Sequence, residues 1–176
     1  MAEKFKEFGE LSNSEVEIMG VNLAEQLMAM DAYKLPPGAA LGMSDEYFDA
    51  LYTLAIRYYG NGRYQDATEI FKNLASLQPE NVRNFKGLGA CYLGLQDYKS
   101  AVNAYTAAYT FSAMDADTSF YLGQAFFFLK DYEEAEGHLR FSEELARRAP
   151  GKWPDIEKWS AQLLERTRSR LHGPKS

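Results

Sequence analysis

A 34-residue repeat constrains the fold of this chain more than any other feature of its sequence. When the sequence is shifted against itself by 34 residues, small residues, aromatic residues and alanines align in three copies. The aligned sets are Ala55, Gly89 and Gly123; Tyr58, Tyr92 and Phe126; Tyr64, Tyr98 and Tyr132; and Ala67, Ala101 and Ala135. Self-similarity at such a period indicates stacked copies of one small structural unit, because a single copy cannot bury its apolar face alone.

The order of residue types within each copy is typical of the tetratricopeptide repeat, a pair of antiparallel helices. We therefore predict an all-α fold, an α-solenoid of three tandem helix pairs with an N-terminal helix before it and a C-terminal capping helix after it. The repeat region is 44–149. Its units are about 48–81, 82–115 and 116–149, with internal turns at 60–63, 94–97 and 129–131.

The glycine-rich stretch GLGACYLG, residues 87–94, looks at first like a phosphate-binding loop. A G-x-G-x-x-G fingerprint that starts at Gly87 requires glycine where this chain has Tyr92, and no strand pattern precedes it. The repeat assigns Gly89 and Ala101 instead to the closest approach of two helices, where a larger side chain would push them apart. We expect helix-packing glycines and no nucleotide site.

Residues 1–43 form an N-terminal arm with an amphipathic helix and a Pro/Gly linker in this interpretation. Apolar residues recur there at three- and four-residue steps, which predicts a helix of about four turns. They are Val16, Met19, Leu23, Leu27 and Met30. Such a stripe either folds back as a cap or pairs with a second copy of the chain. Ser44 is the predicted N-cap of the first repeat helix.

Residues 150–176 are predicted to form a C-terminal capping helix and a polar tail. Pro154 and Asp155 start the helix, and Ile156, Trp159 and Leu163 lie on its apolar face. A repeat array needs such a cap, because the last helix pair otherwise leaves its apolar face in water.

Charge and reactive side chains argue against most kinds of chemistry. A net charge of −6 repels nucleic acids and anionic lipids. His138 and His172 lack metal-ligand spacing, and Cys91 lies in a repeat helix with no base near it in sequence. No secretory signal or apolar run of about 18 residues is visible, so we expect a cytoplasmic protein without membrane insertion. We predict no catalytic residue, no metal and no cofactor: the protein is not an enzyme.

The first helix of each unit is apolar on a second face, which points away from its partner helix. A helix that is apolar on both faces is covered on both in its functional state. We predict that an extended peptide binds here, with Arg83 and Lys86 holding its carbonyls or an acidic side chain. The groove residues are Tyr52, Ile56, Tyr59, Lys86, Ala90, Leu93, Phe120, Gln124 and Phe127. The alternative is permanent cover by the N-terminal arm or by the next helix.

Two segments carry a resemblance to a known family: LYTLAIRYYGNGRYQDATEIFKNL at 51–74 and GLGACYLGLQDYKSAVNAY at 87–105. Together with the order of arm, linker, three repeats and closing helix, they resemble the class II type III secretion chaperones, the SycD/LcrH-like proteins. The resemblance covers about residues 14–165.

This resemblance implies a bacterial cytoplasmic chaperone that works without ATP. It would bind an N-terminal segment of hydrophobic translocator proteins, with a motif of the type Pro-x-Leu-x-x-Pro, in the concave groove and keep them soluble and secretion-competent. The resemblance also implies a homodimer through the N-terminal helix, at Val16, Met19, Leu23 and Leu27. The alternative function is a tetratricopeptide interaction scaffold or transcriptional co-regulator that binds another extended peptide.

Overall fold

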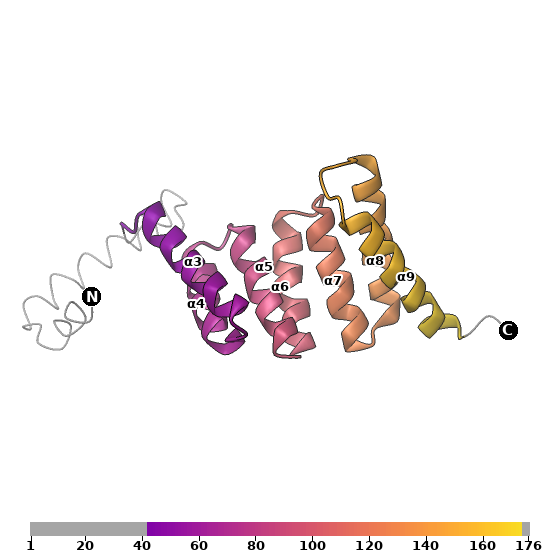
Figure 1. The fold of residues 1–176 in the computed structure, drawn as a ribbon, viewed down its shortest axis with the longest axis horizontal. Helices are drawn as coiled ribbons and strands as arrows, with labels where there is room; N and C mark the ends of the chain where they lie inside the picture. The colour runs from indigo at the N-terminus through magenta and orange to yellow at the C-terminus, as the bar shows by residue number, and fades with distance from the viewer. Residues whose placement is uncertain (1–41, 174–176) are drawn as a thin grey trace, which may run out of the picture. The chain divides into compact units, whose positions relative to one another are not determined.

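The computed structural model describes residues 42–173, and this part of the chain consists of helices and the turns between them (Figure 1). The helices are α3 (Asp45–Gly60), α4 (Tyr64–Leu77), α5 (Val82–Gly94), α6 (Tyr98–Phe111), α7 (Ala116–Leu129), α8 (Tyr132–Arg148) and α9 (Ile156–His172). The predicted all-α fold is confirmed. The predicted N-terminal helix and its dimerisation residues Val16, Met19, Leu23 and Leu27 lie outside the described residues.

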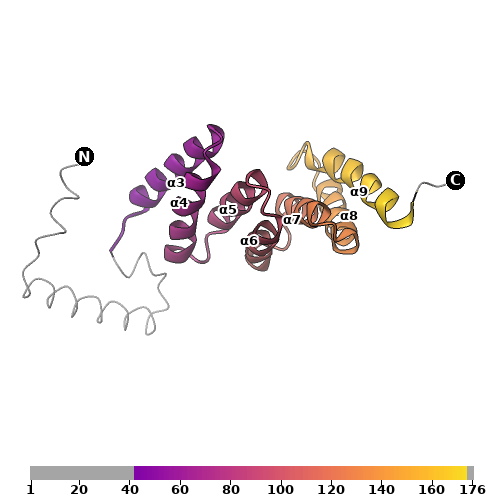
Figure 2. The same ribbon diagram turned by 90° about the horizontal axis from the view of Figure 1, so that it is seen from below.

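Two compact units divide the chain, Met1–Phe48 and Asp49–Ser176. In the described end of the first unit, the Ser44 hydroxyl accepts a hydrogen bond from the Tyr47 amide at 3.3 Å, so the predicted N-cap of α3 is confirmed. Within the second unit, each helix from α4 on packs against the next one in the chain. Figure 2 shows α5, α7 and α9 along one side of this array and α4, α6 and α8 along the other.

Short polar residues start the helices at the unit boundaries and turns. Asp97 and Asp131 each accept a hydrogen bond from the backbone amide three residues ahead, at 3.1 and 3.3 Å. Asn81 and Asp115 accept from the amide two residues ahead, at 3.2 and 3.3 Å. These bonds satisfy amides that have no partner inside the helix, so the chain begins each helix at a defined residue.

Gly87 and Gly89, in the second repeat (82–115), are packing residues, as the repeat pattern predicts. A Cβ atom on Gly89 would stand 2.6 Å from the Tyr105 ring, and one on Gly87 would stand 2.4 Å from the Phe71 ring. Gly94, at the end of α5, meets the ring of Tyr64 at 2.8 Å in the same way. Since carbon atoms do not approach so closely, a side chain at these positions would force the helices apart.

The last helix buries only part of the predicted face. Ile156 is buried as expected, but its buried neighbours on α9 are Ser160, Leu164 and Thr167, while Trp159 stays 40% exposed. Ser160 is small enough to let α9 approach α8, where its hydroxyl hydrogen-bonds that of Ser142 at 3.0 Å. Leu163 is partly buried against the same core, so the prediction was wrong for Trp159 alone, whose ring packs on Phe120 and stays partly in solvent.

No helix in residues 42–173 combines the length and the apolar character needed to cross a bilayer.

Candidate peptide-binding groove

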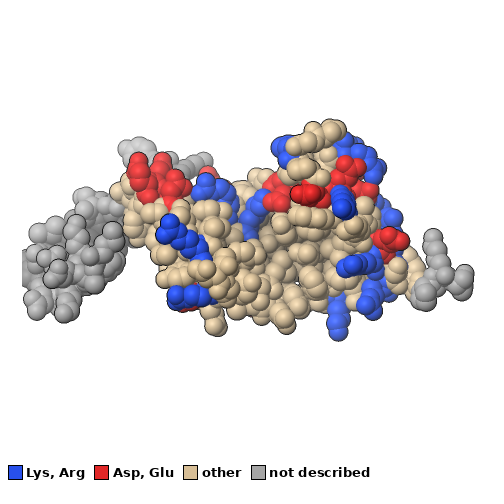
Figure 3. Space-filling view, in the orientation of Figure 1, with Lys and Arg blue, Asp and Glu red and all other residues tan. Residues whose placement is uncertain are grey.

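A cavity of about 450 Å³ opens on the side of the array formed by α3, α5 and α7. It is lined by Tyr59, Lys86, Ala90, Leu93, Gly94, Tyr105, Tyr121 and Gln124. Five of the nine groove residues predicted from the sequence line it together, although they come from three different helices. In Figure 3 the surface over α5 and α7 is largely uncharged, and charged side chains gather along its upper edge.

Tyr105 and Tyr121 belong to this cavity although the sequence pattern did not select them. Tyr105 comes from α6, on the far side of α5, and its ring reaches the cavity because Gly89 has no side chain to block it. Tyr121 stacks on Tyr105 with ring centroids 5.7 Å apart and an interplanar angle of 12°. The missed signal was the pairing of a glycine on one helix with a large aromatic residue on the next, which the 34-residue alignment contains.

The phenols of the cavity are neutral at physiological pH. Burial raises the pKa of Tyr59 and of Tyr121 above the usual value and raises the pKa of Tyr105 well above it. Each of these side chains therefore keeps its O–H group. A largely apolar cavity with a few hydroxyl groups suits a ligand with apolar side chains and backbone carbonyls to be satisfied.

Lys86 is committed to carboxylates of the chain itself. Its ammonium lies 3.1 Å from Asp115 and also contacts Asp117, both at the start of α7. Burial alone would lower the pKa of Lys86, but the hydrogen bonds and charges of Asp117 and Asp115 outweigh it, so the pKa is raised. Lys86 thus ties α5 to α7 at the edge of the cavity, and a ligand would meet a cation that already has its partners.

Arg83 is engaged in a similar way. Its guanidinium contacts the carboxylate of Asp49 at 3.2 Å and lies 4.3 Å from the centre of the Tyr52 ring. The Tyr52 ring in turn meets the ring of Phe71 edge-on, at 5.6 Å. The chain therefore covers part of Tyr52, and Arg83 gives up its carboxylate partner if it is to hold a ligand.

The other predicted groove residues do not share this cavity. Ile56 is 44% exposed on α3, and Phe127 is half-buried among neighbouring rings. Phe120 is only 5% exposed, because Trp159 of α9 packs on it with ring centroids 6.0 Å apart. For Phe120 the alternative of cover by the next helix is thus the correct one: the capping helix reaches over α7.

A second cavity, of about 300 Å³, lies between α7 and α9. It is lined by Phe120, Tyr121, Gln124, Trp159, Gln162, Leu163 and Arg166. Tyr121 and Gln124 line the first cavity as well, so the two cavities adjoin along α7.

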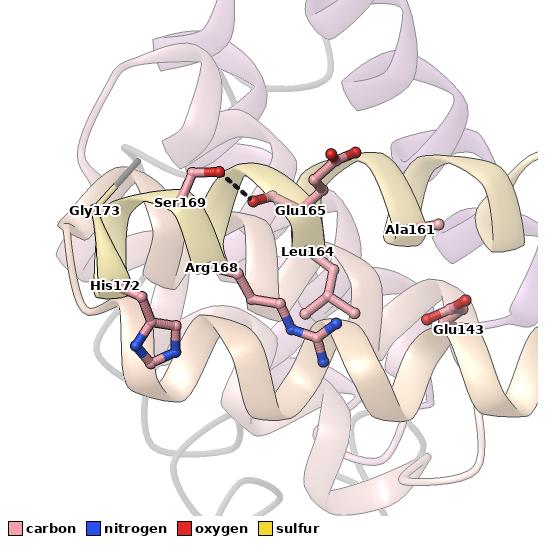
Figure 4. Close-up of a pocket in the computed structure, with 8 residues that line it drawn as sticks. All are labelled: Glu143, Ala161, Leu164, Glu165, Arg168, Ser169, His172 and Gly173. Atoms are coloured by element: carbon pink, nitrogen blue, oxygen red, sulfur yellow. Dashed lines mark hydrogen bonds between the residues drawn. The ribbon is translucent and has the colours of Figure 1, made fainter. Parts of the chain in front are cut away.

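The largest of these cavities, about 630 Å³, lies at the contact of α8 and α9 near Gly173 (Figure 4). Two of its charged side chains pair within the chain: Arg168 contacts Glu136 at 2.7 Å, and Glu143 pairs with Arg147. Ser169 donates its hydroxyl hydrogen to the carbonyl of Glu165 at 3.0 Å. Few groups remain there to recognise a ligand, so the smaller, largely uncharged groove is the better candidate site.

Residues 42–173 contain no group of three His, Cys, Asp or Glu side chains that could hold a metal ion. Cys91 is buried, and burial raises the pKa of its thiol to about 11, so it stays protonated. His138 stacks on Phe126 with ring centroids 5.6 Å apart and meets the Tyr109 ring edge-on at 5.4 Å.

Comparison with known proteins agrees with this architecture. A tetratricopeptide repeat family model matches residues 52–116 and 92–152, which together make up more than half of the chain. Low calcium response locus protein H of Yersinia pseudotuberculosis is 28% identical over 145 residues, which cover 80% of this chain and 85% of that protein.

Two solved structures have the same fold. PcrH in complex with the chaperone binding region of PopD gives a TM-score of 0.70 at 27% identity, covering 74% of this chain and 97% of that one. The translocator chaperone SycD of Yersinia enterocolitica gives 0.71 at 24% identity, covering 75% of this chain and 98% of that one. SycD has also been solved as an alternative dimer.

Proposed function

The chain belongs to the tetratricopeptide repeat family, and from that premise we propose that it is a cytoplasmic type III secretion chaperone for hydrophobic translocator proteins. It binds an N-terminal segment of such a protein in the groove formed by α3, α5 and α7. PcrH, a relative with the same fold, forms a complex with the chaperone binding region of PopD. The bound segment stays soluble and competent for secretion because its apolar side chains are held out of water.

The observation that carries this proposal is the cavity at the centre of the groove. It offers about 450 Å³ lined by apolar groups and neutral phenols, and its cation Lys86 is already paired. Such a cavity favours an apolar anchor side chain, while the phenol hydroxyls satisfy backbone carbonyls of an extended segment. A few anchors of this kind supply most of the affinity of a peptide, so an unfolded client is captured without a large interface.

The proposed action is binding alone, without a catalytic step, a cofactor or a metal. The protein works as a homodimer, in keeping with the dimeric structure of SycD, and Val16, Met19, Leu23 and Leu27 are its proposed contacts. We keep one second candidate function, an interaction scaffold that binds a different extended peptide. The groove supports the scaffold and the chaperone equally, whereas the similarity to low calcium response locus protein H favours the chaperone.

The test is fluorescence anisotropy of a labelled peptide with a Pro-x-Leu-x-x-Pro motif, titrated with wild type and two matched variants. Ala90→Phe places a large ring inside the central cavity, and Thr106→Phe places the same ring on the exposed side of α6. We expect saturable binding to wild type and to Thr106→Phe, and at least about tenfold weaker binding to Ala90→Phe. Equal binding by both variants would locate the peptide elsewhere, and no binding to wild type would leave the scaffold as the leading function.

A further inference from the structure

We propose that the cavity between α7 and α9 is a second anchor site of the same groove, for a large apolar side chain with a carboxylate beside it. The proposal rests on the proposed function, since the occupant is a further part of the same client segment. The site uses Trp159, Leu163 and Arg166 of α9, a helix that the sequence pattern assigns only to capping.

The two cavities are continuous along α7. Tyr121 and Gln124 line both of them, so a peptide that leaves the central cavity over these residues enters the second one directly. Neighbouring packed helices lie about 8–10 Å apart, and an extended chain advances about 3.3 Å per residue. An anchor in the second site therefore lies about three residues from the central anchor along the peptide, in one of the two directions.

Helix α9 has the spacing of a groove-lining helix. Trp159, Leu163 and Arg166 follow one another at steps of four and three residues, as Lys86, Ala90 and Leu93 do on α5. The fully buried face of α9 is a different one, made of Ile156, Ser160, Leu164 and Thr167, and Leu163 packs against its edge. One face thus closes the array, and the other continues the groove.

The apolar part of the second site is incompletely covered by the chain. Trp159 contacts Phe120 and yet keeps 40% of its surface exposed, and Leu163 beside it is only partly buried. A tryptophan that is packed on one side and open on the other offers a flat apolar wall. An aromatic or large aliphatic side chain fits the remaining space of about 300 Å³.

The charge of the site points to an acidic neighbour of that anchor. Among residues 42–173, Arg166 makes no ion pair, and no carboxylate lines the cavity. Lys86 at the central cavity is different, because two aspartates hold it. A guanidinium that no carboxylate of the described residues pairs with, at the edge of an apolar cavity, is suited to bind a carboxylate through two parallel hydrogen bonds.

The experiment uses the full chain and labelled synthetic peptides that share one Pro-x-Leu-x-x-Pro core with Ser at each x. The core is compared with versions extended, at either end, by a two-residue serine spacer and then Phe-Glu, Phe-Lys or Ser-Glu. For wild type we expect the Phe-Glu extension at one of the two ends to lower the Kd of the core about tenfold, and the other extensions to lower it less.

Charge reversal supplies the decisive comparison. Arg166→Glu is expected to reverse the preference, so that Phe-Lys binds more tightly than Phe-Glu, while the Kd of the core stays unchanged. Trp159→Ser is expected to remove the gain from Phe. The control is Arg170→Glu, one turn further along α9 and outside the cavity, which leaves every Kd as in wild type. Circular dichroism of each variant checks that its helices are intact.

The outcomes separate this proposal from the one it rests on. If the core peptide binds but no extension lowers its Kd, the second site is refuted while the central site stands. The same result is expected if residues outside 42–173 occupy the cavity, and it refutes the second site in that case too. A gain that survives Arg166→Glu unchanged also refutes it. If the core does not bind at all, the proposed function fails and the second site fails with it.

Discussion

Replacing Gly89 by alanine tests whether Tyr105 is held at the floor of the groove by the absence of a side chain on α5. The added Cβ atom would lie 2.6 to 2.8 Å from three atoms of the Tyr105 ring. This ring is only 1% exposed, so it cannot swing away into water. Either the ring or the helix has to shift, and the cavity that the ring lines shifts with it.

The magnitude follows from two opposing effects. Exchanging glycine for alanine inside a helix stabilises it by about 1 kcal/mol. Overpacking a well-packed core costs about 1–3 kcal/mol, and three ring atoms inside contact distance place Gly89→Ala at the upper end. We expect a net loss of about 2 kcal/mol in the free energy of unfolding, which lowers the Tm by about 4–8 °C in a protein of this size.

Gly137 provides the matched control. It lies inside α8, and a Cβ atom there would meet nothing within 4 Å. Gly137→Ala therefore gains the stabilisation of the helix by alanine without a clash of the added Cβ atom, and it should raise the free energy of unfolding by about 1 kcal/mol. Urea unfolding followed by circular dichroism measures both variants. If Gly89→Ala were stabilised as much as Gly137→Ala, the assignment of Gly89 to close helix packing would be refuted.

Three further predictions separate the core, the groove, the pH response and the arm. Ala101→Leu should overpack the second repeat and lower the free energy of unfolding by about 1–3 kcal/mol, because Ala101 is fully buried. Ile56→Asp, at an exposed position, should keep the Tm and lose peptide binding. If Ile56→Asp lowered the Tm more than Ala101→Leu, the two faces would be misassigned. Burial lowers the pKa of His138 below 6.5, so the unfolded chain binds a proton at this residue more readily than the folded chain does. The free energy of unfolding should therefore fall as the pH drops below about 6.5. His138→Phe should lessen this loss in melts at about pH 5.5 and 7.5, and an unchanged loss would contradict the role given to His138. Leu23→Asp should yield a monomer by light scattering, and an unchanged mass would assign the arm to capping instead.

Local patterns along the chain predicted the helices well. The 34-residue period placed the turns between paired helices correctly, because glycine and short polar residues end and start helices through bonds with their own neighbours. The small residues Gly89 and Ala101 were assigned to helix contacts for a similar reason. A repeat array buries its core between units that are adjacent in sequence, so the 34-residue alignment also identifies the residues that pack between helices.

The contents of the groove were predicted less completely. The pattern selects residues by their position on one helix, and five of the nine selected residues do line the central cavity. Tyr105 was missed because it reaches the cavity from a different helix, through the gap left by Gly89. Lys86 was expected to be available to a ligand, but Asp115 and Asp117 at the start of α7 neutralise it.

By itself the sequence determined that this chain forms helices, where most of them begin and end, and that they pair in three units, because those properties depend on neighbours within one repeat. Only the tertiary structure decided which face of α9 is buried, because residues 149–155 interrupt the period before that helix. The rotation of α9 about its axis then depends on how closely Ser160 lets it approach α8. That contact covers Phe120 with Trp159 and leaves Arg166 at the end of the groove, an arrangement that no spacing along the chain encodes.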